Sequence, residues 1–139
     1  MKKSINEKEQ CVQTDVMQSV ILSELRIGNK IHFIICDKED SKLDEYKEIT
    51  VDITDFEFIR DNNSLFEAIE LQHDILNRCG FTHNGFCYTN GDFKILKHLN
   101  KDYEFTLLYK DNKISSNIKY LHRLQNAVFV LEERELTVA

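Results

Sequence analysis

The sequence lacks proline, has only four glycines among its 139 residues, and contains no internal repeat. Its longest uninterrupted apolar runs, such as Phe33–Cys36 and Ala127–Leu131, are far shorter than the ~20 residues that a membrane-spanning helix needs. Polar residues follow the basic start Met1-Lys2-Lys3, so we expect no signal peptide. Hydrophobic residues make up 42% and charged residues 30% of the chain, which excludes a collagen-like or disordered protein.

The common signatures of catalysis and cofactor binding are also missing. We find no phosphate-binding G-x-x-x-x-G-K-[ST] loop, no dinucleotide-binding G-x-G-x-x-G, no G-x-S-x-G elbow and no H-E-x-x-H. The sequence therefore assigns no catalytic residue and no cofactor, and the chain is interpreted as a protein that is not an enzyme. The four cysteines are irregularly spaced and do not suggest a disulfide framework. Because free thiols are typical of a reducing compartment, we expect the protein to be cytoplasmic. They are Cys11, Cys36, Cys79 and Cys87.

Charge is distributed unevenly along the chain, whose formal net charge is −6. Residues 36–70 contain four bases and twelve acids, a net charge of 4 − 12 = −8. Residues 94–123 contain seven bases and three acids, or +4. Such runs are most often solvated surface. The functional interpretation is that the acidic segment meets a basic partner and the basic segment an acidic one.

The fold class predicted from the apolar periodicity is α+β, with residues 1–14 disordered or loosely attached and residues 15–139 forming a single domain. In the first half of the domain, alternation predicts strands, in the second of which Ile49, Val51 and Ile53 point inward. Thr54-Asp55-Phe56-Glu57 predicts a capping box, in which the Thr54 hydroxyl caps a two-turn helix. The expected elements are a helix over 15–25, a turn at 26–29, strands at 30–36 and 46–53, a charged loop at 37–45 and a candidate strand at 65–71.

In the second half, three apolar-aromatic runs separated by turn residues predict an antiparallel β-meander. They are residues 81–88, 93–99 and 103–110, preceded by a short helix at 72–79 and followed by a turn at 111–113. A long C-terminal helix capped by Ser116 or Asn117 is expected to pack on this sheet, because apolar residues recur at helical spacing. They are Ile118, Leu121, Leu124, Val128 and Leu131.

Three groups of polar residues are candidate sites. Cys79, His83 and Cys87 have zinc-ligand chemistry, but structural zinc needs four ligands, so we expect buried or half-buried thiols and no metal. His122 has no evident carboxylate partner for general-base catalysis, which favours a structural histidine. Gln125-Asn126 in a helix interior predicts a polar contact within the fold.

Three segments resemble a family of small uncharacterised phage and prophage proteins. The matching stretches read ELRIGN at residues 24–29, IEL through ILNRCGF at residues 69–81, and IKYLHRLQNAVFVL followed by EL at residues 118–136. Glu70 and Gln72 stand where the family has proline and threonine. The family has no assigned catalytic residues, so the resemblance implies only an origin on a mobile genetic element.

The resulting functional hypothesis is a phage-type protein that binds and inhibits a host defence protein, as an anti-CRISPR protein does. Its partner would carry a basic, nucleic-acid-binding surface, and an RNA-guided, RNA-targeting nuclease is one candidate. The alternative is a small nucleic-acid-binding accessory factor that uses the basic β-meander, whose aromatic residues are typical of a stacking surface. No membrane contact is expected. The predicted partner-binding residues are Asp37, Glu39, Asp40, Asp44, Glu45 and Glu48.

Overall fold

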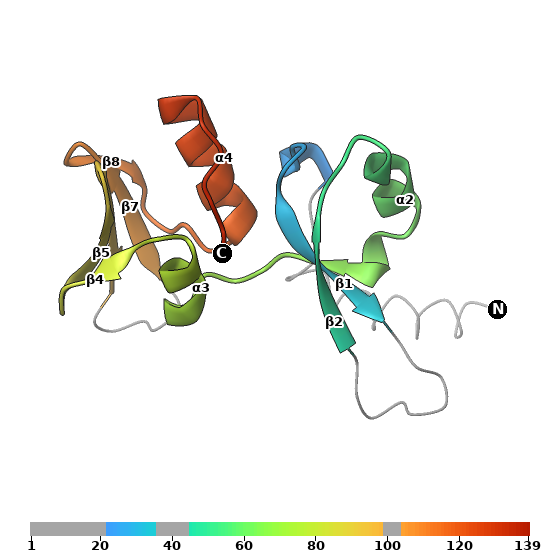
Figure 1. Cartoon of the computed structure of the whole chain (residues 1–139), viewed down its shortest axis with the longest axis horizontal. Coiled ribbons are helices and arrows are strands. Elements are labelled where there is room, and N and C mark those ends of the chain that lie inside the picture. Colours follow the sequence, from blue (N-terminus) through green and yellow to red (C-terminus); the bar gives the residue numbers. More distant parts are fainter. Residues whose placement is uncertain (1–21, 36–44, 99–103) are drawn as a thin grey trace, which may run out of the picture. The chain divides into compact units, whose positions relative to one another are not determined.

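A computed structural model describes residues 22–35, 45–98 and 104–139 of the chain (Figure 1). It contains two antiparallel sheets with helices, which confirms the predicted α+β class. The chain divides into two compact units, residues 1–69 and residues 70–139. That residues 15–139 act as one domain stays a prediction. No helix in the described part of the chain is long and apolar enough to cross a membrane.

The first unit is built on a three-stranded antiparallel sheet in the order β2-β1-β3. Strands β1 and β2 pair over six positions, from Lys30 opposite Thr50 to Ile35 opposite Glu45. The core includes Ile31, Val51, Ile59 and Phe66. The described elements are η1 (Leu22–Glu24), β1 (Lys30–Ile35), β2 (Glu45–Thr50), α2 (Asp55–Asp61), η2 (Asn63–Leu65) and β3 (Phe66–Glu67).

Three predictions lie wholly or mostly outside the described residues: the helix over residues 15–25, disorder or loose attachment of residues 1–14, and the charged loop at 37–45. The turn at 26–29 is confirmed, with Gly28 at φ +97°. The prediction that Ile53 points inward is wrong, because its side chain is 69% exposed. Strand β2 ends at Thr50, and the chain turns over the next residues to start α2. The strand expected over 65–71 is limited to β3 and an isolated bridge between Glu70 and Tyr120, and Leu65 belongs to η2.

The capping box predicted at the start of α2 does not form. Thr54 already has helical backbone angles (φ −74°, ψ −13°), whereas a capping residue normally has an extended backbone, and its side chain makes no capping hydrogen bond. The carboxylate of Asp55 instead accepts a hydrogen bond from the backbone N–H of Asp52 at 2.8 Å. The helix itself follows as predicted and ends at Asp61, with Asn62 as its C-terminal capping residue.

The second unit contains a five-stranded antiparallel sheet in the order β4-β5-β6-β7-β8, which confirms the predicted meander. The short helix before it is confirmed and is followed by Gly80 at φ +82°, a conformation that favours glycine. The elements are α3 (His73–Arg78), β4 (Thr82–His83), β5 (Cys87–Asn90), β6 (Phe93–Lys97), β7 (Phe105–Tyr109), β8 (Asn112–Ser115) and α4 (Leu121–Glu132).

The sheet has two more strands than the sequence predicted. The run 81–88 bends at Asn84 and Gly85, so its ends form β4 and part of β5 rather than one strand. The last turn lies at Lys110 and Asp111, not at 111–113, because these two residues both have positive φ and close a two-residue hairpin between β7 and β8.

Helix α4 covers one face of this sheet (Figure 1). Leu121, Leu124 and Val128 on the helix are buried, and the Tyr109 hydroxyl of β7 donates to the carboxylate of Glu132 at 3.3 Å. Buried strand residues facing this layer alternate with half-buried or exposed ones, as the pleat requires. They are Tyr88, Phe93, Ile95, Phe105 and Leu107.

The predicted caps of α4, Ser116 and Asn117, are wrong, because the helix begins at Leu121 after an extended Tyr120 (φ −120°, ψ 146°). Tertiary hydrogen bonds hold the preceding residues extended. The N–H of Ile118 donates to the carbonyl of Phe105 at 2.8 Å, and the carbonyl of Lys119 accepts from Leu71 at 2.9 Å. These backbone groups are therefore not available for a first helical turn.

Candidate functional site

Of the six predicted partner-binding residues, only Glu45 and Glu48 are among the described ones; Asp37, Glu39, Asp40 and Asp44 lie outside them. Glu45 is exposed at the start of β2, opposite Ile35 at the end of β1. Glu48 is half-buried, and its carboxylate lies 3.9 Å from the Nζ of Lys30. Part of the Glu48 charge is therefore balanced within the sheet, which leaves Glu45 as the stronger described candidate.

The two units differ in net charge. Residues 1–69 contain 9 Lys and Arg against 15 Asp and Glu, a net charge of 9 − 15 = −6. Residues 70–139 contain 9 of each, so this unit is neutral. The whole net charge of the chain thus belongs to the unit that contains the acidic segment.

The cysteines and histidine weighed as zinc ligands are not brought together. Cys79 is buried at the end of α3, where its carbonyl accepts from the Nδ2 of Asn90 at 3.0 Å. Cys87 opens β5 with its Sγ 3.5 Å from the Oδ1 of Asn84. His83 packs against Tyr88. Among the residues that the structure describes, no group of three His, Cys, Asp or Glu side chains could hold a metal ion.

We expect purified protein to contain no stoichiometric zinc, because a structural site needs four convergent ligands. The measurement is elemental analysis of the purified chain after dialysis against a chelator. One zinc per chain that survives dialysis would contradict this expectation. A Cys87→Ser variant would then show whether the β5 thiol is a ligand, since loss of the metal in that variant would identify it.

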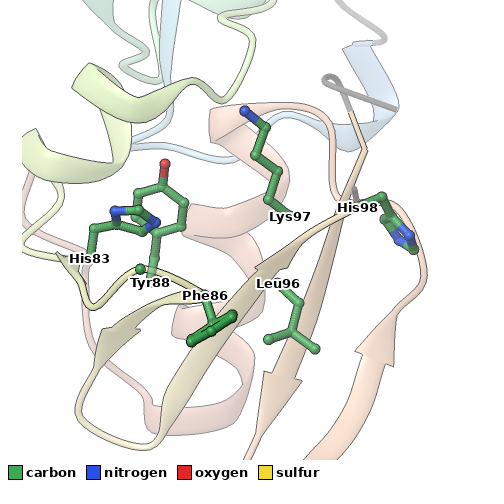
Figure 2. A pocket seen from close by; sticks show the side chains of 7 residues that line it. His83, Phe86, Tyr88, Leu96, Lys97 and His98 are labelled. Carbon is green, nitrogen blue, oxygen red and sulfur yellow. The ribbon is translucent and has the colours of Figure 1, made fainter. Parts of the chain in front are cut away.

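The most distinctive feature of the described surface is a pocket of about 560 Å³ in the second unit, where β5 begins and β6 ends (Figure 2). Its walls are aromatic, apolar and basic, and none of the described residues that line it is acidic. Leu96 and Lys97 come from neighbouring positions of β6, so they point to opposite faces of the sheet. The lining residues are His83, Gly85, Phe86, Tyr88, Leu96, Lys97 and His98.

Phe86 is the most exposed large apolar residue described, at 88%. It lies in the turn between β4 and β5, which the Asn84 side chain holds in shape. The Oδ1 of Asn84 accepts from the N–H of Phe86 at 3.3 Å and from the N–H of Cys87 at 3.1 Å, while the N–H of Asn84 donates to the Cys87 carbonyl at 3.0 Å. Gly85 supplies the positive φ of +97°. The turn thus presents Phe86 to solvent from an ordered backbone.

A cluster of aromatic rings borders the pocket on the side of α3. His83 and Tyr88 are opposite each other on β4 and β5, with ring centroids 4.5 Å apart. The Tyr88 hydroxyl lies 3.1 Å from the Nδ1 of His73, whose ring is 5.8 Å from that of His83. Burial raises the pKa of Tyr88, so its hydroxyl stays protonated at neutral pH and can donate to His73. This cluster fixes the inner wall of the pocket.

A hydrogen bond with Thr106 orients the ring of His98, another residue that lines the pocket. The hydroxyl of Thr106 has one proton, which it donates to the carbonyl of Ser116 at 3.1 Å. It therefore accepts from the Nε2–H of His98 at 2.9 Å. This assigns the proton of a neutral His98 to Nε2.

The sequence did not predict this pocket: it suggested His83 only as a metal ligand and Lys97 only as part of the basic stretch 94–123. One signal was present: Asn84-Gly85 is a turn dipeptide, so the phenylalanine after it belongs to the loop and not to a strand. The position of Leu96 beside the turn that carries Phe86 depends on the register of β5 and β6, in which Cys87 pairs with Leu96. That register is not evident from composition alone.

Three polar residues of the motifs at residues 24–29 and 118–136 lie in the core rather than at this site. Asn29 of the first motif and His122 and Gln125 of the last are almost completely buried. The interpretation of His122 and Gln125 as structural residues agrees with this burial. Comparison with family models, curated protein sequences and solved structures finds no match to this chain.

Proposed function

We propose that this protein is a phage-type inhibitor without enzymatic activity, which binds a host defence protein through the acidic part of its first unit. The target would be a protein with a basic, nucleic-acid-binding groove, such as an RNA-guided nuclease. Counter-charge would let the acidic surface compete with nucleic acid for that groove. The resemblance to phage proteins and the net charge of −6 on residues 1–69 support this proposal.

The observation that carries the proposal is the β1–β2 pairing. Because Ile35 and Glu45 are register partners, residues 36–44 connect two adjacent strand ends. Asp37, Glu39, Asp40 and Asp44 belong to that connection, and exposed Glu45 follows it directly. Substitutions in this connection leave the buried residues Ile31 and Val51 of the same hairpin unchanged.

An inhibition assay tests the proposal directly. A guide-RNA-loaded, RNA-targeting nuclease cleaves a labelled target RNA in the presence of increasing amounts of this protein. We expect cleavage to stop near one protein per nuclease complex. Affinity capture from a bacterial lysate, with and without nuclease treatment, extends the test to other targets. A stoichiometric protein partner that survives nuclease treatment supports an inhibitor, and recovery of nucleic acid alone contradicts it.

Neutralising the acidic connection should slow association by at least about tenfold at low salt, because long-range attraction raises association rates by that amount or more. The variant combines Asp37→Asn, Glu39→Gln, Asp40→Asn, Asp44→Asn and Glu45→Gln. Its association rate should also depend less on salt than that of the parent. Its free energy of unfolding should change by only about ±0.5 kcal/mol. Binding kinetics against the captured partner at low and high salt provide the measurement.

A matched control removes five exposed acids elsewhere: Glu57→Gln, Asp74→Asn, Asp92→Asn, Glu133→Gln and Glu135→Gln. Both variants change the net charge from −6 to −1, so the comparison separates local from global charge. If the control slows association as much as the test variant, or if neither does, the acidic connection is not the binding surface.

A second candidate function is nucleic-acid binding by the β4–β8 sheet. The pocket favours it, since Phe86, Lys97 and two histidines line it and none of its described lining residues is acidic. In the first function the acidic first unit contacts a host protein, and in the second the β4–β8 sheet contacts nucleic acid. Affinity capture distinguishes them by whether a protein or nucleic acid is recovered.

A further inference from the structure

We propose that Asn84 is a site of spontaneous covalent modification, in which the backbone nitrogen of Gly85 attacks the Asn84 side chain and converts it to aspartate and isoaspartate. The inference concerns the chain itself and depends on neither proposed function. The sequence contains two asparagine–glycine pairs, Asn84-Gly85 and Asn90-Gly91. Glycine after asparagine favours this reaction in both pairs, because no Cβ hinders the attacking nitrogen. The surroundings of the two pairs differ, and they favour Asn84.

The reaction balances with water and hydroxide as its only co-reactants. The Gly85 nitrogen loses its proton to hydroxide and bonds to the Asn84 Cγ, so that negative charge develops on Oδ1. The Cγ–Nδ2 bond then breaks, and the nitrogen takes a proton from water and leaves as ammonia. This closes a five-membered succinimide, which water opens at either carbonyl to give aspartate or isoaspartate. Both products are ionised at neutral pH, so each modified chain gains one negative charge.

The turn between β4 and β5 keeps the reacting atoms close. The Oδ1 of Asn84 accepts from the N–H of Phe86 at 3.3 Å, which folds the side-chain carbonyl back over the peptide bond to Gly85. The ring closed by this hydrogen bond contains both the Asn84 Cγ and the Gly85 nitrogen. None of the described residues accepts a hydrogen bond from the Gly85 N–H, so the nitrogen loses no such bond when it reacts. Asn84 and Gly85 are both exposed, which admits water and hydroxide.

The same turn stabilises the charge that develops on Oδ1. In addition to Phe86, the N–H of Cys87 donates to this oxygen at 3.1 Å, and the Cys87 Sγ lies 3.5 Å from it. Donors that already point at an oxygen on which negative charge develops lower the barrier, as in an oxyanion hole. The Asn84 Nδ2, which leaves, donates to none of the described residues.

Asn90-Gly91 lacks these features. The Nδ2 of Asn90 donates to the Cys79 carbonyl at 3.0 Å, which retains the leaving nitrogen and directs the side chain toward the end of α3. Asn90 is half-buried, and its Oδ1 accepts from none of the described residues. We therefore expect Asn84 to react at least about tenfold faster than Asn90 in the folded protein, less than the effect of a single oxyanion donor in an enzyme.

The modification changes the turn and the charge beside the pocket. Aspartate can still accept from the N–H groups of Phe86 and Cys87, so Asn84→Asp should keep the urea midpoint of the parent. It adds a carboxylate next to a pocket whose described lining has none. Isoaspartate adds one carbon to the main chain before Gly85, so the turn that presents Phe86 must rearrange.

Mass spectrometry of proteolytic peptides, after incubation in mildly alkaline buffer, measures both sites in the same parent molecule. Conversion of amide to acid raises the mass of the peptide, and chromatography separates its aspartate and isoaspartate forms. The rate should rise with hydroxide concentration, because the Gly85 nitrogen must lose its proton. Incubation in concentrated urea is the control: both pairs lose their surroundings there, so the ratio of the two rates should fall toward one.

Modification of Asn90 as fast as, or faster than, that of Asn84 in the folded chain overturns the proposal. So does Asn84 that stays intact over a period in which the urea-unfolded chain is modified. The same preference for Asn84 in buffer and in urea would show that the neighbouring sequence sets the rates, and this would overturn the part assigned to the turn. A preference for Asn84 that is present in buffer and lost in urea supports it.

Discussion

Leu124→Ala should lower the free energy of unfolding by about 2–5 kcal/mol, the largest stability effect we expect from a single substitution at α4. Leu124 is fully buried in the middle of that helix, one turn from buried Leu121 and Val128. Replacing it removes its apolar contacts and leaves a cavity that neighbouring side chains fill only in part. Urea unfolding of the variant and the parent measures the difference.

Val130→Ala provides the matched control on the same helix. Val130 is exposed, so its truncation should shift the free energy of unfolding by only about ±0.5 kcal/mol. A loss below about 1 kcal/mol for Leu124→Ala would mean that α4 contributes little to the fold. Equal losses for the two variants would show that burial in the core does not decide the effect.

The same variant tests whether residues 15–139 form one cooperative domain. If they do, Leu124→Ala should accelerate hydrogen exchange of the slowest amides on both sides of residue 70. If the two units unfold separately, only amides of residues 70–139 should respond. Exchange measured by peptide-resolved mass spectrometry distinguishes these results, with Val130→Ala as the unperturbed reference.

Strands and helices with regular apolar periodicity could be predicted from the sequence, and their ends could not. Strand β1 and the buried face of α4 follow from alternation and from helical spacing at Leu121, Leu124 and Val128, because burial of one face imposes those periods. The start of α4 could not be predicted in this way. Ser116 and Asn117 are good capping residues, but the N–H of Ile118 and the carbonyl of Lys119 bond to distant parts of the chain. Local propensity was overridden by tertiary hydrogen bonds.

The two candidate sites also differ in how far they could be predicted from the sequence. Acidic residues of the 36–48 region are visible in any count of charges, because charge is a property of the sequence itself. The pocket depends on two facts that the sequence does not contain: the bend at Asn84 and Gly85, and the pairing of Cys87 with Leu96. His83 illustrates the difference, since its spacing from two cysteines suggested a metal site, whereas β4–β5 pairing directs it to Tyr88.

The ELRIGN motif at residues 24–29 also has a physical explanation. Asn29 is completely buried, and its Oδ1 accepts from the backbone N–H of Arg26 at 2.6 Å. Its own N–H donates to the Arg26 carbonyl at 3.0 Å, and its carbonyl accepts from Val51 at 2.8 Å. One residue therefore joins the turn before β1 to the residue after β2. Gly28 completes the turn with a positive φ and donates to the Val51 carbonyl.

Asn29→Ala should therefore destabilise the first unit by about 1–3 kcal/mol, because the backbone N–H of Arg26 loses its acceptor in a part-buried turn. The effect should appear in residues 22–35 and 45–69 as faster hydrogen exchange, together with a lower urea midpoint. Asn77→Ala, which removes an exposed asparagine side chain on α3, is the control and should stay within about ±0.5 kcal/mol.

A change below about 0.5 kcal/mol in Asn29→Ala would show that the turn is held by its backbone alone, and the motif would then need another explanation. The expected result has a consequence for the acidic connection. Asn29 and Val51 close the end of the β1–β2 pair opposite to residues 36–44, since Lys30 pairs with Thr50 at one end and Ile35 with Glu45 at the other. Loosening that closed end should therefore weaken partner binding by less than neutralising the acids does, because the charges stay in place. Association rates of Asn29→Ala and of the five-acid variant, measured with the same partner, compare the two effects.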